Sequence, residues 1–376
     1  MKVKTLNDIY DRKNNSFDDM RFVLASLVLF VHSYALLYGE SGAKDFFVKM
    51  TNYQLGLSTI AVYGFFILSG FFMIQSLESN SSFLKYTKNR VLRIIPAFWM
   101  SLGLFSFLII PMISHQIDIF SFNKGSSLEF FIKAGTFHIF GYAWTITGAF
   151  PNNPMIDGIN GSMWTLKHEI ALYFILPLIV WLTYAKRNLL LIVFSVFFLL
   201  ALLNITTGFN LFTIPCCRAW VFASNEYPFF IVFASYFFAG VIFYKFKDYI
   251  LVSKRFFLMF VFLFILSMFL GNMKIITLIS LPYIILYFGS VYRKKIFSIK
   301  GDYSYGMYIY AFPIQQILVH FYKNDINAIQ LFMMSFIVTL FVSILSWHFF
   351  EKKILKMKNF VIKKNSISKE RKYEHI

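Results

Sequence analysis

Apolar runs long enough to cross a membrane recur along the whole chain, and they restrict the fold more than any other feature of the sequence. About 20 consecutive apolar residues span the ~30 Å hydrocarbon core of a bilayer as one helix. Charged residues make up only 14% of the chain, against about 25% in a soluble domain. The pattern predicts an all-α, polytopic membrane protein with about ten transmembrane helices in one integral-membrane domain, 22–350. The expected spans are 22–39, 57–77, 94–113, 163–184, 189–205, 228–244, 256–271, 275–291, 303–322 and 330–350.

The basic residues are distributed in the way that sets membrane orientation. If the N-terminus is cytoplasmic, 28 of the 36 Lys and Arg residues fall in segments on the inner side, and the C-terminus is then cytoplasmic too. An excess of positive charge inside is the general rule for membrane proteins. The formal charge of +18 is therefore explained by topology, with the anionic lipid bilayer as its partner. It gives no reason to expect a nucleic-acid partner.

Three segments lie outside the expected spans. Residues 1–21 form a polar cytoplasmic leader; a cleaved signal peptide is the less favoured alternative, because no small-residue cleavage site follows. Residues 351–376 form a basic cytoplasmic tail that is expected to be disordered, since it lacks an apolar period. Within the long outer segment 114–162, residues 128–150 are apolar enough to cross the membrane, re-enter it or lie on its surface.

The first expected span carries a histidine in its apolar centre. Eleven residues at 1.5 Å each place His32 about 16 Å deeper than Arg21, and eleven steps of 100° return nearly to the same helix face. Arg21, Ala25, Val28 and His32 therefore form one stripe, with a cation at the inner surface and an imidazole near the midplane. An ionisable residue at that depth is costly and usually functional. We favour catalysis or proton relay over a histidine that only packs against a neighbouring helix.

Two arginines stand at the inner end of the third span. Arg90 and Arg93 are three residues apart and share a helix face, with Lys85 and Lys88 just upstream. Guanidinium groups bind phosphate well, so the pair suits a phosphate-rich cytoplasmic ligand. Ordinary positive-inside anchoring is an equally good explanation of these residues.

Small and acidic residues mark two further spans. Ser69 and Gly70 leave a small patch in a Phe-rich helix, which suits close helix packing or, as the less favoured alternative, an apolar slot for an acyl chain. Glu169 enters the bilayer near the start of its span and needs a partner or a proton there. Asn160, Ser162 and Thr165 are candidate caps for that helix.

The last two spans also carry polar groups. Tyr305, Tyr308, Gln315 and Gln316 bring hydroxyl and amide groups into the membrane. Glu351 stands at the inner end of the last span, where pairing with a nearby cation such as Arg93 would explain it without a functional role.

Taken together and in order, these segments resemble the acyltransferase-3 family of bacterial integral-membrane O-acyltransferases. The resemblance covers about residues 18–351, and each motif alone is weak. The motifs that carry it are Arg21 with His32, "FFILSG" ending in Ser69 and Gly70, Arg90 with Arg93 and Pro96, "SMWTLKHEIALYFILP" with Trp164, Glu169 and Tyr173, "YSYGMYIYAFPIQQ", and Glu351. One departure is Ala311, where many members have a histidine.

The resemblance implies transfer of an acyl group, usually acetyl from acyl-CoA (acetyl-CoA), to a hydroxyl of an envelope polysaccharide or lipid-linked glycan at the bacterial cytoplasmic membrane. It implies His32 as the catalytic residue, as general base or as acyl carrier, with Arg21 as its partner. Arg90 and Arg93 carry over to the donor side. The other motif residues carry over as substrate-binding candidates: Ser69, Gly70, Trp164, Glu169, Tyr173 and Glu351. No metal and no resident cofactor are expected, and a periplasmic partner protein is left open.

Two other classes of protein fit a polytopic chain with polar groups at mid-depth. A glycan or lipid transporter should show related halves and broken helices, and no internal repeat is evident in this sequence. A lipid-linked glycan polymerase would also have many spans and a large outer loop, but it has no use for an arginine pair at the inner face.

Overall fold

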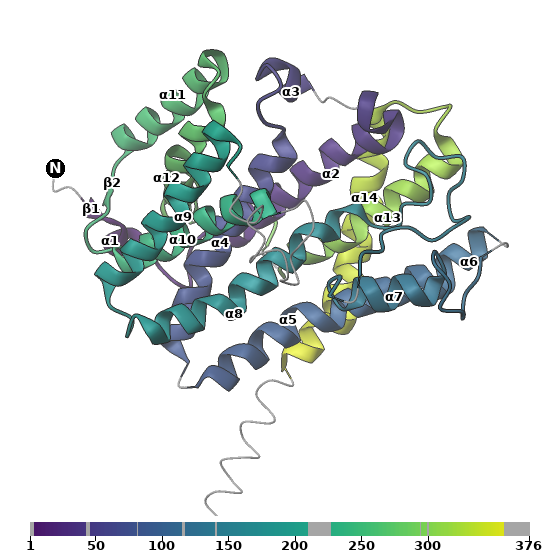
Figure 1. Ribbon diagram of the computed structural model, residues 1–376, viewed down its shortest axis with the longest axis horizontal. Coiled ribbons are helices and arrows are strands. Elements are labelled where there is room, and N and C mark those ends of the chain that lie inside the picture. Colours follow the sequence, from purple (N-terminus) through teal and green to yellow (C-terminus); the bar gives the residue numbers. More distant parts are fainter. Residues whose placement is uncertain are drawn as a thin grey trace, which may run out of the picture.

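The computed structural model describes residues 4–42, 46–80, 82–114, 117–139, 141–209, 227–293, 295–298 and 301–356 (Figure 1). Helices form nearly all of the regular structure there, as predicted; the exception is a two-residue antiparallel ribbon of β1 (Lys4–Thr5) and β2 (Leu251–Val252). The helices are α1 (Leu6–Ile9), α2 (Phe17–Gly42), α3 (Phe46–Met50), α4 (Leu57–Ser79), α5 (Phe83–Leu104), α6 (Ile110–Ile113), α7 (Ser127–Gly135), α8 (Leu166–Leu182), α9 (Arg187–Thr207), α10 (Tyr227–Lys245), α11 (Lys254–Leu270), α12 (Met273–Val291), α13 (Ser304–Tyr322) and α14 (Ala328–Ser346). Most of the expected basic tail, from residue 357 on, lies outside the described residues.

Eight helices in the described residues are long and apolar enough to cross a membrane. They include α2, α4, α8, α9, α10 and α12, together with α5 continued to Ile113 and α14 continued to Lys356. The other two expected spans correspond to α11 and α13, which are not among the eight. α11 is only 17 residues long, and α13 carries two glutamines and a histidine, so a polytopic membrane protein is confirmed while the number ten stays a prediction.

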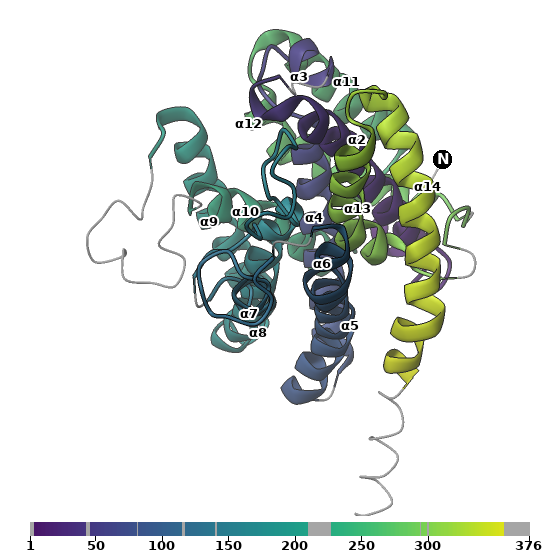
Figure 2. The ribbon, with the colours of Figure 1, turned by 90° about the vertical axis from the view of Figure 1, so that its right-hand side faces the viewer.

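A central helix organises the bundle. α4 packs against α10, α2 and α12, and α2, α13 and α14 lie side by side (Figures 1 and 2). The α4–α10 contact is close because a Cβ atom at Gly70 would stand 1.8 Å from the carbonyl oxygen of Phe237, and one at Gly240 would stand 2.1 Å from that of Ile67. Gly70 thus lets two backbones touch, which is the packing role favoured by the sequence.

Apolar side chains cover the outside of the bundle as well as its core. Only 11% of the most apolar stretch of α9 is buried inside the protein, and Ile192, Val196 and Leu199 are exposed. Such surfaces are unfavourable in water and suit contact with lipid chains.

The outer segment between α6 and α8 folds onto the bundle without crossing the membrane. α7 has nine residues and is about 14 Å long, too short for a ~30 Å hydrocarbon core. The chain then runs without regular helix to Asn160, which caps the short 3₁₀ turn Gly161–Thr165 by accepting from the Ser162 N–H. Of the three possibilities for residues 128–150, a full crossing is therefore wrong.

The expected N-terminal leader is structured from Lys4 onward. The backbone N–H of buried Leu6 donates to the carbonyl of Ile250 at 2.8 Å, beside the β1–β2 ribbon. α2 begins at Phe17, five residues earlier than expected, because the side chain of Asn15 accepts from the Phe17 N–H and two aspartates occupy the first turn. This packs the leader against the rest of the bundle and places Arg12 in the lining of the site described next.

Candidate active site

A cavity of about 740 Å³ opens between α2, α4, α5, α8 and α13. Its volume lies within the ~300–1,000 Å³ typical of small-molecule sites. Five basic residues line it, Arg12, Arg21, Lys85, Arg90 and Arg93, against three acidic residues, Asp18, Glu169 and Asp302. Arg12, Arg21 and Lys85 lie near the starts of α2 and α5, and Arg90 and Arg93 follow within three turns of α5. This part of the cavity, which we call its mouth, is therefore positively charged.

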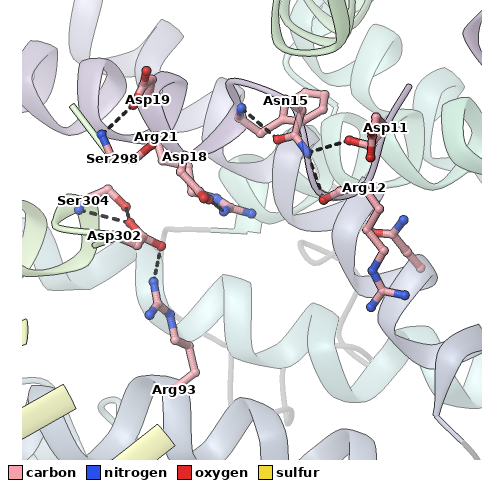
Figure 3. Close-up of polar contacts among 12 residues, drawn as sticks. Asp11, Arg12, Asn15, Asp18, Asp19, Arg21, Arg93, Ser298, Asp302 and Ser304 are labelled. Carbon is pink, nitrogen blue, oxygen red and sulfur yellow. Dashed lines mark hydrogen bonds and ion pairs between the residues drawn. The ribbon is translucent and has the colours of Figure 1, made fainter. Parts of the chain in front are cut away.

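Arg21 lies at this mouth with a partner from its own helix. Its Nη1 atom is 2.8 Å from Oδ1 of Asp18, three residues earlier (Figure 3). Its guanidinium lies 4.7 Å from the ring centre of Phe72. The two side chains are 25% and 35% exposed, so water and ligand can still reach the pair.

Arg93 is held more firmly. It forms an ion pair with Asp302 (Figure 3). Its guanidinium also lies 5.4 Å from the ring centre of Trp347. Asp302 in turn accepts from the Ser304 hydroxyl at 2.5 Å and from the Ser304 N–H at 3.2 Å. Burial alone would raise the pKa of Asp302, but the guanidinium groups of Arg93 and Arg21 and the hydrogen bonds from Ser304 together hold that pKa below its usual value.

A second carboxylate fixes the segment that carries Asp302. Asp19 is buried and accepts three backbone N–H bonds, from Ile296 at 2.5 Å, Phe297 at 3.1 Å and Ser298 at 2.7 Å (Figure 3). These bonds tie the chain before α13 to the first turn of α2. Neither Asp19 nor Asp302 was predicted as a site residue, because the partners across the bundle lie more than 200 residues away in the sequence.

Arg90 contrasts with its neighbour. No hydrogen bond or ion pair to its guanidinium is found among the described residues, and its Nε atom is buried without a partner there. The charged groups around it are Arg93 and Arg21, with Tyr86 and Tyr173 nearby. A guanidinium that has other cations nearby and no counter-ion among the described residues is suited to bind an anionic ligand.

Three polar side chains meet deeper in the cavity, where α4 faces α8. The hydroxyl of Ser69 donates to Oε1 of Glu169 at 2.6 Å, and the hydroxyl of Tyr173 donates to the same oxygen. Ser69 and Tyr173 are also 3.3 Å apart. Glu169 thus has the partners that a carboxylate at this depth requires.

Two aromatic side chains line the deep end of the cavity, farthest from its mouth. The rings of Phe65 and Tyr308 meet edge to face, with centres 5.8 Å apart. The Tyr308 hydroxyl donates to the carbonyl of Ser162 at 2.7 Å and lies 2.5 Å from the Thr165 hydroxyl. From mouth to end, the lining therefore changes from cationic to hydrogen-bonding to aromatic.

His32 does not line this cavity. It is half-buried on α2, its ring meets that of Phe312 edge to face at 5.3 Å, and Phe312 stands one helical turn beyond Tyr308 on α13. Ala25 and Val28 of the predicted stripe are buried, so the stripe faces the bundle interior. His32 therefore contacts α13 one helical turn beyond a residue that lines the cavity, and its catalytic role stays a prediction.

The predicted residues divide into two groups. Arg21, Ser69, Arg90, Arg93, Glu169 and Tyr173 line the cavity; His32, Gly70, Trp164 and Glu351 do not. Trp164 packs against Phe233, with ring centres 5.6 Å apart. Glu351 is buried and accepts from the Ser346 hydroxyl at 3.0 Å, while the ion pair of Arg93 goes to Asp302 instead.

Other lining residues were not predicted as site residues. Arg12 and Asp18 were overlooked because they precede the first apolar run, although Asp18 stands three residues before Arg21, the spacing of a helical ion pair. Across the described ranges, no three His, Cys, Asp or Glu side chains come together as a metal site would need.

Comparison with known proteins gives three findings. The family model described as "Acyltransferase domain" matches residues 14–348. An O-acetyl transferase of Shigella phage Sf6 is 28% identical over 358 residues, which covers 91% of this chain and 96% of that protein. No solved structure matches the chain at a significant level.

Proposed function

The chain belongs to the acyltransferase-3 family, and from this premise we propose that it transfers an acyl group, acetyl in the first instance, from cytoplasmic acyl-CoA to a hydroxyl of a cell-envelope polysaccharide or lipid-linked glycan. The relative from phage Sf6 supports O-acetyl transfer as the reaction class. The proposed place is the bacterial cytoplasmic membrane, which the protein crosses several times.

The single observation that carries the donor assignment is the graded lining of the cavity. Phosphate groups of acyl-CoA fit the mouth, where Arg90 has no counter-ion among the described residues and Arg12 and Lys85 stand nearby. The pantetheine arm then passes Glu169, and the thioester reaches the aromatic end at Tyr308. A long ligand with a highly charged head and an uncharged reactive end matches this order of surroundings.

We place the proposed chemistry between the deep, aromatic end of the cavity and His32. The acceptor hydroxyl approaches from the outer side, and the imidazole takes its proton as general base. The hydroxyl oxygen attacks the thioester carbonyl, the new C–O ester bond forms, the C–S bond breaks, and the thiolate recovers the proton from the imidazolium. In the other form of this proposal the imidazole nitrogen first receives the acyl group itself and passes it on.

The proposal requires one aromatic pair to move for the thioester to reach His32. Phe65 and Tyr308 line the cavity in contact with each other, and Tyr308 stands one helical turn before Phe312, whose ring contacts the imidazole. In the proposed cycle, rotation of these rings on donor binding brings the thioester to His32. The two hydrogen-bond partners of Tyr308 lie at the start of α8, so entry of the acyl group would be felt there as well.

A direct assay tests the proposal. Membranes that contain the protein are incubated with radiolabelled acetyl-CoA, and we expect label in the envelope glycan as an ester that base releases. A transporter or a lipid-linked glycan polymerase would leave the glycan unlabelled, so absence of label with active, inserted protein would contradict the proposal.

The substitution His32→Ala examines the catalytic assignment. General base catalysis typically contributes about 10²–10⁴-fold, so labelling should fall by at least about 100-fold while the protein remains in the membrane. His320→Ala is the matched control, because His320, like His32, is a histidine on a helix whose ring contacts that of a phenylalanine, Phe150, but it lies near the C-terminal end of α13. Full activity of the His32 variant would exclude this histidine from the chemistry.

A further inference from the structure

Glu169 presents one occupied and one open oxygen to the cavity. Oε1 accepts from both Ser69 and Tyr173, whereas no hydrogen bond to Oε2 is found within the described part of the chain. Ser69 comes from α4, and Tyr173 is one turn along α8 from Glu169. Because both donors hold the same oxygen, the carboxylate is fixed in one orientation.

Arg90, a cation that lines the same cavity, does not take the open oxygen. Arg90 lies close to Tyr173, yet it forms no ion pair with Glu169. With Oε1 satisfied by two donors, Oε2 can still accept a hydrogen bond from a group in the cavity that Glu169 lines. The cavity therefore holds a fixed hydrogen-bond acceptor that waits for a donor from a ligand.

Depth restricts which ligand can supply that donor. Ser69 lies ten residues before Ser79 at the end of α4, so the cluster is about 15 Å inside the helix end. A ligand anchored by phosphates at Arg90 must send a long arm inward and carry an N–H or O–H group on it. The pantetheine arm has two amide N–H groups between the phosphates and the sulfur.

We propose that Oε2 of Glu169 accepts a hydrogen bond from an amide N–H of the donor's pantetheine arm, which makes Glu169 a specificity-determining residue for amide-bearing thioesters. This rests on the proposed function, because it takes acyl-CoA as the donor. Ser69 and Tyr173 act as positioning residues that turn the open oxygen toward the arm.

The experiment compares acetyl-CoA with an analogue in which both amide nitrogens of the arm are methylated. Methylation removes the N–H groups and keeps the phosphates, the carbonyls and the thioester. With the wild-type protein we expect kcat/KM to fall tenfold or more on methylation. With Glu169→Leu the value for acetyl-CoA should fall by a similar factor, and the ratio between the two donors should approach one.

Three variants guard the result. Glu169→Gln keeps the volume and a carbonyl, so it should fold even if the Leu variant does not, and its donor ratio should fall at least threefold. Arg90→Ala should weaken both donors equally and leave the ratio unchanged. Glu78→Gln removes a carboxylate of α4 that pairs with Lys245 outside the cavity, and it should change neither rate nor ratio.

The possible outcomes separate the two proposals. An unchanged donor ratio in both Glu169 variants, or a wild-type protein indifferent to methylation, overturns the role of Glu169. Failure of the wild-type protein to use acetyl-CoA at all would instead overturn the proposed function.

Discussion

The surroundings of Arg90 and Arg93 differ, although the two residues stand three apart on one face of α5. Arg93 pairs with Asp302 and lies over Trp347. It therefore joins α5 to the start of α13 and to the end of α14. Arg90 has no hydrogen bond or ion pair to any described residue. Two residues on one helix face can therefore have different roles. The guanidinium of Arg93 connects helices, whereas that of Arg90 is available to a ligand.

The largest effect should come from breaking the tie. Asp302→Asn leaves the Arg93 charge buried without its counter-ion, and removal of one partner of a buried pair costs about 3 kcal/mol of unfolding free energy. We expect a clearly lower midpoint of thermal unfolding in detergent, with KM for acetyl-CoA changed by less than about threefold at a temperature where the protein is folded.

A double variant sharpens this result. Asp302→Asn with Arg93→Gln replaces the ion pair by two amides that can still bond, and it should recover most of the lost stability. If the double variant is stable but has lost donor binding, Arg93 contacts the ligand and the contrast with Arg90 disappears.

The next effect should fall on donor affinity alone. Arg90→Ala removes a charged hydrogen-bond donor worth about 1.5–3 kcal/mol, which corresponds to about a ten- to hundredfold higher KM for acetyl-CoA. Stability should not fall, because no described residue loses a bond to Arg90. Steady-state kinetics and thermal unfolding of the same preparation measure both; a loss of stability without a change in KM would reverse the assignment of the two arginines.

The smallest effect should come from Asp18→Asn. Its pair with Arg21 is partly exposed, and such pairs contribute about 0–1 kcal/mol. The unfolding midpoint should move little, and KM for acetyl-CoA should fall slightly because Arg21 is released to the mouth. A large loss of activity would indicate that Asp18 orients Arg21 for catalysis.

Much of the fold follows from local patterns. The span expected at 57–77 appears as α4, Leu57–Ser79, because hydrophobicity alone defines a helix that lies wholly in the bilayer. The third span was expected from residue 94, but α5 begins at Phe83 and runs through the basic stretch. Hydropathy identifies the part of a helix that lies in the membrane, but it does not identify where the helix begins. The start of α5 is capped by Ser82, well before the apolar residues of this span.

The site was predictable only in part, for a related reason. Helical spacing is enough to place Arg90 beside Arg93, because both stand on one helix. The contact of Ser69 with Glu169 joins positions 100 residues apart, and that of Arg93 with Asp302 joins positions 209 apart. Such meetings depend on how whole helices pack, and a pattern within one segment carries no information on them.

The chain's first residues have a practical meaning for handling the protein. The hydroxyl of Tyr10 and the side chain of Gln75 exchange hydrogen bonds of 3.1 and 2.9 Å, and this contact lies next to Arg12 at the cavity mouth. Leu6 anchors the same strip of chain to Ile250. A purification tag is therefore better placed at the C-terminus. A variant truncated to start after Leu6 would lose the contact with Ile250, and the segment around Arg12 at the cavity mouth would be held less firmly.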